Sequence, residues 1–225
     1  MTASSAEPVK IPVDGTEGVS GLWQTAPRAK ACFVLAHGAG AGMRHPFLES
    51  ITTQLASLRI ASLRYQFFYM DRGSKRPDPP KLCHAVVRGA VAEAARRTPA
   101  PLIAGGRSFG GRMTSQAQAE NPLPGVRGLA FLAFPLHPAK RPASDRAQHL
   151  FAVRIPMLFL QGTRDELAEI QLLHALLAKL GSKTNSRLID AADHSFHVPA
   201  RSGRTDASVL TELATTLSDW VDSLL

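Results

Sequence analysis

The sequence has few cysteines, no long apolar run and no apolar leader, and each shortage excludes a class of protein. Its 225 residues contain two cysteines, Cys32 and Cys83, which are far apart and have no metal-ligand spacing around them. A disulfide framework is therefore excluded, and two reduced thiols are expected. No apolar run approaches the roughly 20 residues of a membrane-spanning helix, and the first residues lack the features of a signal peptide. We expect a cytoplasmic protein with no membrane partner.

Acidic residues are outnumbered by basic ones, 18 to 26, which leaves a net charge of +8. Such a balance is compatible with a nucleic-acid partner. The basic residues are dispersed, however, apart from modest clusters at residues 72–81 and 140–146, and no aromatic residues interleave with them. We therefore expect a solvated basic surface and no nucleic-acid partner, and we leave the attraction of anionic substrates open.

The composition and length are those of one globular domain. Apolar residues make up 44% of the sequence and charged residues 20%, which is ordinary for a folded protein. The length suits one α/β domain with a full core, and no internal repeat or linker divides the chain. The prediction is a single domain over residues 1–225, with a flexible N-terminus at residues 1–8.

Short apolar segments alternate with longer segments of helical periodicity. Extended segments at residues 10–14 and 19–23 predict a leading β-hairpin, and the polar, proline-rich segment 69–80 predicts an exposed loop. Further strands are expected at residues 31–36, 60–67, 102–105, 126–134, 156–161 and 186–190, and helices at residues 46–58, 80–97, 110–120, 166–180 and 206–225. This alternation predicts an α/β fold with a mostly parallel, doubly wound sheet and helices on both faces. Ligand chemistry is expected at the carboxyl ends of the strands.

The segment Gly106-Arg-Ser108-Phe-Gly110 stands between an apolar strand and a helix. A serine at the tip of so sharp a turn adopts a strained backbone conformation, and the residues two positions away on either side crowd each other. Only glycine fits at those positions, which explains Gly106 and Gly110. The order of strand, serine-bearing turn and helix is that of a nucleophile elbow and makes Ser108 the candidate nucleophile.

Two further polar residues follow predicted strands in the order that such an elbow requires. A serine hydroxyl needs a base that a third group orients. Asp165 comes directly after an apolar strand, and His194 lies just beyond the last one, so the order is Ser108, Asp165, His194. The alternative role for Asp165 is the N-cap of the following helix. Glu166 and Asp190 are the substitutes if Asp165 is not the acid.

Three histidines near the candidate site have different expected roles. His197 lies in the same loop as His194 and is its main rival as the base. His194 is favoured because it comes right after the short turn that follows the strand, while Phe196 can pack inward and hold the loop. His37 does not fit the chain order of a base. Its ring is expected to hold the loop around it in shape through hydrogen bonds.

Acyl transfer also requires donors that face the developing oxyanion, each worth about 3–4 kcal/mol. One is expected to be the backbone N–H of Phe109, the residue after the nucleophile. The second is expected from the loop His37-Gly-Ala-Gly-Ala-Gly42, with Ala39 first and Gly40 next. Small residues there let the backbone approach a substrate carbonyl.

The glycines of the same loop also suit a dinucleotide-binding turn. In that pattern the third glycine would fall at Met43, and the next strand would end in an acidic residue where Arg64 and Tyr65 stand. No P-loop lysine is present either. The dinucleotide alternative is therefore disfavoured.

Three arginines, Arg107, Arg112 and Arg164, flank the candidate site. A guanidinium can support a fold through salt bridges or can recognise an anionic group of a ligand. Salt-bridged support is the favoured interpretation, and recognition of an anionic part of the substrate is the alternative.

Three segments carry a resemblance to a known family: His37-Gly-Ala-Gly-Ala-Gly-Met-Arg-His-Pro-Phe47, Gly105-Gly-Arg-Ser-Phe-Gly-Gly-Arg112 and Phe134-Pro-Leu-His-Pro138. With them the chain resembles the α/β-hydrolases, and in particular the small lidless Tex-type and KANSL-type hydrolase-like proteins, relatives of the dienelactone hydrolases. The resemblance implies an α/β-hydrolase fold and a serine hydrolase site at the three residues named above, with no metal or organic cofactor. Dienelactone hydrolases proper use a cysteine nucleophile, so their particular substrate is not implied. The branch also includes members known as parts of larger assemblies.

The connection between the strands at residues 126–134 and 156–161 is too short for a separate lid domain. The site is therefore expected to be open to a small ester or thioester from solution. The prediction is a serine hydrolase that cleaves a carboxylic ester or thioester through an acyl-enzyme on Ser108. The alternative is a catalytically silent interaction module with the hydrolase fold. The acyl group, the leaving group and the oligomeric state are left open.

Overall fold

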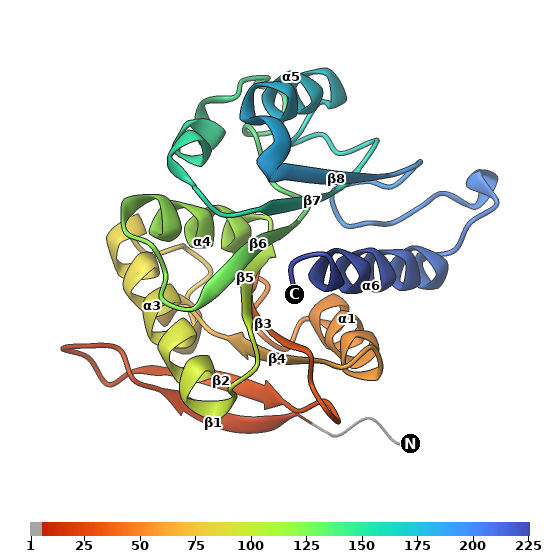
Figure 1. Cartoon of the computed structure of the whole chain (residues 1–225). Helices are drawn as coiled ribbons and strands as arrows, with labels where there is room; N and C mark the ends of the chain where they lie inside the picture. Colours follow the sequence, from red (N-terminus) through yellow and green to blue (C-terminus); the bar gives the residue numbers. More distant parts are fainter. Residues whose placement is uncertain (1–5) are drawn as a thin grey trace.

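The structure, a computed structural model, describes residues 6–225 and has an eight-stranded sheet at its centre (Figure 1). The strands are β1 (Glu7–Ile11), β2 (Val19–Gln24), β3 (Ala31–Ala36), β4 (Ile60–Tyr65), β5 (Leu102–Arg107), β6 (Val126–Leu132), β7 (Met157–Gly162) and β8 (Thr184–Ile189). Their order in the sheet is β1-β2-β4-β3-β5-β6-β7-β8. The pairs β1–β2 and β2–β4 are antiparallel, and the other neighbouring pairs are parallel. The predicted mostly parallel sheet is confirmed.

Helices cover both faces of this sheet, as predicted. The helices are α1 (Pro46–Ser57), α2 (Phe68–Asp71), α3 (Pro80–Arg97), α4 (Phe109–Glu120), α5 (Ile170–Leu180) and α6 (Asp206–Asp222). Figure 1 shows α3 and α4 on one side of the sheet and α1 and α6 on the other. The fold is therefore a doubly wound α/β sandwich.

Strand β3 explains why the sheet requires helices on both faces. All six of its residues are buried, and successive side chains of a strand point to opposite faces. Cys32 and Val34 join the apolar core beneath α3 and α4. Phe33 and Leu35 join the core beneath α1 and α6. The continuous apolar run in the sequence is thus that of a strand buried on both faces.

Most helices lie where their periodicity predicts them. Helix α3 spans the predicted residues, and α1, α4 and α6 differ from the prediction only at their ends. Local signals account for this agreement. Pro46 and Pro80 occupy the first turns of α1 and α3, where the missing N–H of proline is harmless. Thr205 and Ser208 form a capping box at the start of α6.

Helix α5 begins later than predicted, at Ile170 instead of residue 166. The reason is a turn closed by Asp165. The carbonyl of Asp165 accepts from the N–H of Ala168 at 3.2 Å, and its Oδ1 accepts from the N–H of Leu167 at 2.8 Å. The N-cap of α5 is Glu169. The alternative role of Asp165 as the cap of this helix is therefore wrong.

The prediction of an exposed loop at residues 69–80 is correct only in part. Residues 71–77 are exposed, but Tyr69 belongs to the short helix α2 and is buried. Its ring stacks on Phe67 with the centroids 6.2 Å apart and meets the edge of Phe109 at 6.4 Å. Burial against these two rings outweighs the polar character of the residues that follow.

The prediction of a flexible N-terminus at residues 1–8 can be compared with the structure only in its last part. Residues 1–5 lie outside the described residues. Glu7 and Pro8 belong to β1, where they pair with Trp23 and Leu22 of β2. The prediction is wrong for these two residues because the edge strand begins earlier than expected.

The connection between β6 and β7 forms no lid domain, as predicted. It contains one short 3₁₀ helix, η1 (Asp145–Ala152), which packs on α4. Ser115 Oγ of α4 lies 2.7 Å from His149 Nε2 of η1, and the same hydroxyl donates to the carbonyl of Arg112 at 3.0 Å. This second serine–histidine contact holds η1 against α4. We interpret it as structural, because Ser115 is fully buried and its hydroxyl proton is already donated to Arg112 O.

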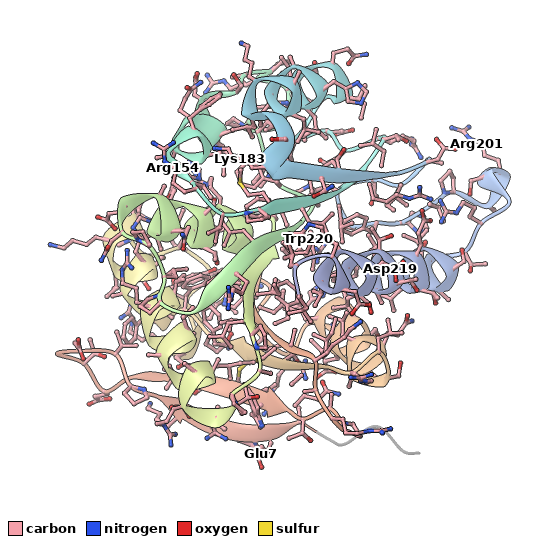
Figure 2. The ribbon with its side chains drawn as sticks, in the orientation of Figure 1. Glu7, Arg154, Lys183, Arg201, Asp219 and Trp220 are labelled. Carbon is pink, nitrogen blue, oxygen red and sulfur yellow. The ribbon has the colours of Figure 1, made fainter. Side chains whose placement is uncertain are left out.

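The C-terminal helix α6 packs against the sheet near β7 and β8. Trp220 faces the strands from this helix (Figure 2), and its Nε1–H donates to Asn185 Oδ1 of β8 at 3.2 Å. Within residues 6–225, no helix combines the length and the hydropathy needed to cross a membrane.

Candidate active site

Ser108 lies at the turn between β5 and α4, with φ 49° and ψ −116°. These angles are uncommon for a residue other than glycine and indicate backbone strain. A Cβ on Gly106 would lie 2.6 Å from Ala36 O, and one on Gly110 would lie 2.5 Å from His37 O. Neither distance is sterically possible. The expectation that only glycine fits on either side of the serine is therefore confirmed.

The structure brings Ser108, Asp165 and His194 together from three separate turns at the carboxyl edge of the sheet. His194 Nε2 lies 2.8 Å from Ser108 Oγ, and His194 Nδ1 lies 2.7 Å from Asp165 Oδ2. With its proton on Nδ1, the ring donates to the carboxylate and accepts from the serine hydroxyl. The Asp165 side chain is fully buried, and that of His194 is 25% exposed. This geometry allows a proton to move from the hydroxyl to the imidazole.

The Asp165 carboxylate has donors on both oxygens. Oδ1 accepts from the N–H of Leu167 at 2.8 Å, while Oδ2 accepts from Gln161 Nε2 as well as from His194. Gln161 is fully buried in β7, and its Oε1 has no partner among the described residues. Gln161 was not among the residues predicted from the sequence. Its one signal was an amide inside an otherwise apolar strand, shortly before the candidate acid.

The other candidates for the acid and the base are not at the site. His197 has a side chain that is 63% exposed, and its Nδ1 lies 2.9 Å from Asp206 Oδ2. This hydrogen bond raises the pKa of His197. Glu166 and Asp190, the substitutes for Asp165, are exposed and make no hydrogen bond to His194 within the described part of the chain.

Phe196 packs inward, as expected from its position in the histidine loop. It is 2% exposed, and its ring stacks on Phe47 with the centroids 5.6 Å apart. Its φ of 63° is unusual for an aromatic residue. The packing of this side chain therefore compensates a strained turn two residues after His194.

His37 holds its loop in shape through both ring nitrogens, as predicted. Its Nε2 accepts from the N–H of Phe67 at 3.2 Å, so the ring proton is on Nδ1 and is donated to Gly38 O at 2.7 Å. The side chain is fully buried. Burial lowers the pKa of His37 to about 4, which keeps the ring in the neutral form that these two bonds require.

Two backbone N–H groups near Ser108, the predicted oxyanion donors Ala39 and Phe109, have no hydrogen-bond acceptor among the described residues. The N–H of Ala39 has no acceptor within residues 6–225, and Phe109 is the first residue of α4, so its N–H has no intrahelical acceptor. A Cβ on Gly38 would lie 3.9 Å from Ser108 Cβ, which places this loop next to the serine. The second-choice donor, the N–H of Gly40, already donates to Tyr69 Oη at 3.3 Å.

None of the three flanking arginines forms an ion pair within the described residues, so the interpretation as salt-bridged supports is wrong. Arg164 is exposed. Arg112 is half-buried, with its Cζ 5.9 Å from the Phe109 ring centroid. Arg107 is buried and donates to Ser195 Oγ at 3.1 Å. Burial lowers the pKa of both Arg107 and Arg112.

Solved structures of similar fold include a dienelactone hydrolase from Anabaena variabilis, with a TM-score of 0.78 and 20% identity over 99% of this chain and 100% of that chain. A serine hydrolase without a lid from Xanthomonas campestris has a TM-score of 0.74 and 18% identity over 98% of this chain and 97% of that chain. Est1E from Butyrivibrio proteoclasticus has a TM-score of 0.67 and 15% identity over 98% and 100%.

A family model described as an alpha/beta hydrolase domain matches residues 29–222. The matched region contains the elbow, the loop at residues 37–42 and both turns that carry Asp165 and His194. The sheet order and the missing lid agree with this assignment. The chain therefore belongs to the alpha/beta hydrolase family, and its fold is that of the small lidless members related to dienelactone hydrolase.

Proposed function

We propose that this protein is a serine hydrolase that cleaves a carboxylic ester or thioester through an acyl-enzyme on Ser108. The observation that carries the proposal is the pair of hydrogen bonds made by one imidazole, 2.8 Å to Ser108 Oγ and 2.7 Å to Asp165 Oδ2. A serine with a purely structural role would not require a hydrogen bond to an imidazole that a carboxylate orients. A histidine with a purely structural role would not require a serine with a strained backbone as its partner. The two features together are those of an activated nucleophile.

In the first half of the reaction, Ser108 Oγ attacks the substrate carbonyl carbon while His194 Nε2 takes the hydroxyl proton. The buried Asp165 carboxylate stabilises the resulting imidazolium through Nδ1–H. The N–H groups of Phe109 and Ala39 stabilise the oxyanion of the tetrahedral intermediate. Collapse breaks the bond to the leaving alcohol or thiol, which receives the proton from His194. An acyl group then remains on Ser108.

In the second half, His194 removes a proton from a water molecule as that water attacks the acyl-enzyme. Collapse of the second intermediate releases the carboxylic acid and returns the proton to Ser108. The 25% exposure of the His194 side chain supports access of water to this position. The absence of a lid between β6 and β7 supports small substrates that arrive from solution.

Labelling with a fluorophosphonate probe tests the proposal. The wild-type protein is expected to become covalently labelled on the peptide that contains Ser108, and Ser108→Ala is expected to lose the label while it keeps its fold. Circular dichroism and the melting temperature serve as the folding control. A folded wild-type protein that takes up no label would contradict the proposal and favour the silent interaction module.

Substrate class is tested separately, with p-nitrophenyl esters of graded acyl length beside acyl-coenzyme A thioesters. The open site predicts the highest kcat/KM among short acyl chains. A steady rise of kcat/KM with long chains would contradict the expectation of a small substrate.

A further inference from the structure

Arg107 occupies a position at which the geometry of the elbow does not restrict the residue type. It is the last residue of β5 and directly precedes Ser108, and the sterics of the turn constrain the glycines on either side but not this residue. Yet its side chain is almost completely buried, at 9% exposure. Its Nε has no acceptor among the described residues. A buried guanidinium without an ion-pair partner is unfavourable for folding, so its presence calls for a separate reason.

Its contacts all lead to the loop that carries His194. Nη2 of Arg107 donates to Ser195 Oγ at 3.1 Å, and Ser195 is the residue after His194. The guanidinium also lies over the ring of Phe47, 5.1 Å from its centroid. Phe47 in turn stacks on Phe196, with an angle of 12° between the rings. Arg107 therefore reaches the histidine loop directly and through an aromatic stack.

The position of the His194 loop depends on such contacts, because its other hydrogen bonds run largely between residues of the loop itself. Asp193 Oδ1 accepts from the N–H groups of Ser195 and His197, and the N–H of Asp193 donates to the carbonyl of His197 at 3.0 Å. The turn includes the strained Phe196. Its position relative to Ser108 is then set by contacts made from outside the loop, and those of Arg107 come from the residue next to the nucleophile.

The charges around Arg107 fit a role in holding this loop. Two acidic side chains on the turns that carry the candidate acid and base, Asp193 and Asp165, act electrostatically on Arg107, and neither forms an ion pair with it among the described residues. His45, the N-cap of α1, is a further titratable neighbour. Burial and the Arg107 charge together lower the pKa of His45, which favours the neutral form of this ring beside the guanidinium.

We propose that Arg107 is a positioning residue that holds the His194 loop against the nucleophile elbow, through its hydrogen bond to Ser195 and its contact with Phe47. The proposal rests on the hydrolase function proposed above, because it assigns the base to His194. Arg107 makes no hydrogen bond to Ser108 Oγ or to the imidazole in the part of the chain that the structure describes, so in this proposal it acts on the reaction by fixing where the imidazole lies. A displacement of about 1 Å at such a site can lower a rate about 100-fold.

The test compares Arg107→Met with Arg107→Lys in steady-state hydrolysis of a short p-nitrophenyl ester. Arg107→Met keeps the apolar stem and removes both the donor and the charge, and it is expected to lower kcat about 100-fold with KM nearly unchanged. Arg107→Lys restores one donor and is expected to recover part of kcat. Each kcat is divided by the fraction of protein that binds the fluorophosphonate, so that loss of folded protein does not count as loss of rate.

A second variant keeps the test decisive if Arg107→Met does not fold. Ser195→Ala removes the acceptor and leaves the guanidinium over Phe47, and it is expected to lower kcat roughly tenfold. In the double variant of Arg107→Met and Ser195→Ala, the combined loss is expected to be clearly smaller than the product of the two losses, because both act through one hydrogen bond. Arg127→Met, on the exposed side of β6, is the matched control and is expected to keep the wild-type kcat.

Two results would overturn the proposal. One is an unchanged kcat per labelled site in both Arg107→Met and Ser195→Ala. The other is a loss in the double variant equal to the product of the single losses. Failure of the proposed function looks different, because then the wild-type protein itself neither binds the probe nor hydrolyses the ester.

Discussion

The Asp165 carboxylate accepts hydrogen bonds from a backbone N–H, from an amide side chain and from an imidazole. Its Oδ1 closes the turn after β7, and its Oδ2 faces His194. One residue thereby shapes its own turn and orients the candidate base. At the scale of single residues, the site depends on which polar atoms already have a hydrogen-bond partner. His197 illustrates this, because its Nδ1 is bonded to the exposed Asp206 and not to a residue of the site.

The two histidines of the same loop are predicted to differ sharply in their effect on activity. His194→Gln removes the proton acceptor of Ser108 and is expected to lower kcat by about 10³-fold or more. His197→Gln replaces an exposed side chain that bonds to Asp206, and it is expected to change kcat by less than twofold. Ester hydrolysis by both variants checks this. Loss of activity in His197→Gln with retention in His194→Gln would reverse the assignment of the base.

At the scale of elements, β5, the elbow and α4 form one continuous unit whose geometry depends on close backbone contacts. The N–H of Ser108 donates to Leu132 O of β6 at 2.9 Å, which fastens the turn to the neighbouring strand. The start of α4 lies so near β3 that a methyl group does not fit between them at Gly110. The strained serine is thus held by its surroundings on both sides.

Gly110→Ala is predicted to lower the free energy of unfolding by about 1–3 kcal/mol, because the new methyl group would meet His37 O at 2.5 Å and the Cβ of Ala36 at 2.7 Å. Gly38→Ala is the matched control, since its Cβ would meet atoms no closer than 3.7 Å. Urea unfolding of both variants measures the difference. Equal stability of the two would show that the helix start can move away from β3 at little energetic cost.

At the scale of the whole molecule, stability is expected to depend on two histidines that the fold keeps neutral. Burial lowers the pKa of His37 to about 4, and burial with the nearby Arg112 charge lowers that of His149 to about 4. In the unfolded chain both rings take up a proton near pH 6.5. As the pH falls from about 6.5 to about 4, the unfolded state therefore binds protons that the folded state does not, and the folded state loses stability.

The expected loss for the fully buried His37 is about 3 kcal/mol across this range, and His149 adds a smaller amount because it is partly exposed. Urea unfolding at pH 7, 6 and 5 measures the slope. His149→Gln is expected to flatten it, and a control change at the exposed His174 of α5 is expected to leave it as it is. A stability that rises as the pH falls below 6.5 would contradict the assignment of both rings as buried and neutral.

The sequence alone predicted the mostly parallel sheet, the elbow and the helices α1, α3, α4 and α6, because these follow from local rules, whereas it missed α2 and the start of α5. The period of apolar residues, proline at the starts of α1 and α3, and glycine on either side of Ser108 act over a few residues and need no knowledge of distant contacts. The order of serine, aspartate and histidine along the chain was equally visible.

Which polar atoms meet at the site depends on tertiary packing. It brought His194 and not His197 to Ser108, and it engaged the N–H of Gly40 with the unexpectedly buried Tyr69. It also added Gln161 to the site and gave Arg107 a hydrogen bond to Ser195 in place of the expected salt bridge. The physical reason is that a hydrogen bond or a ring contact depends on side-chain direction within about an ångström, and loops set that direction through packing between distant segments.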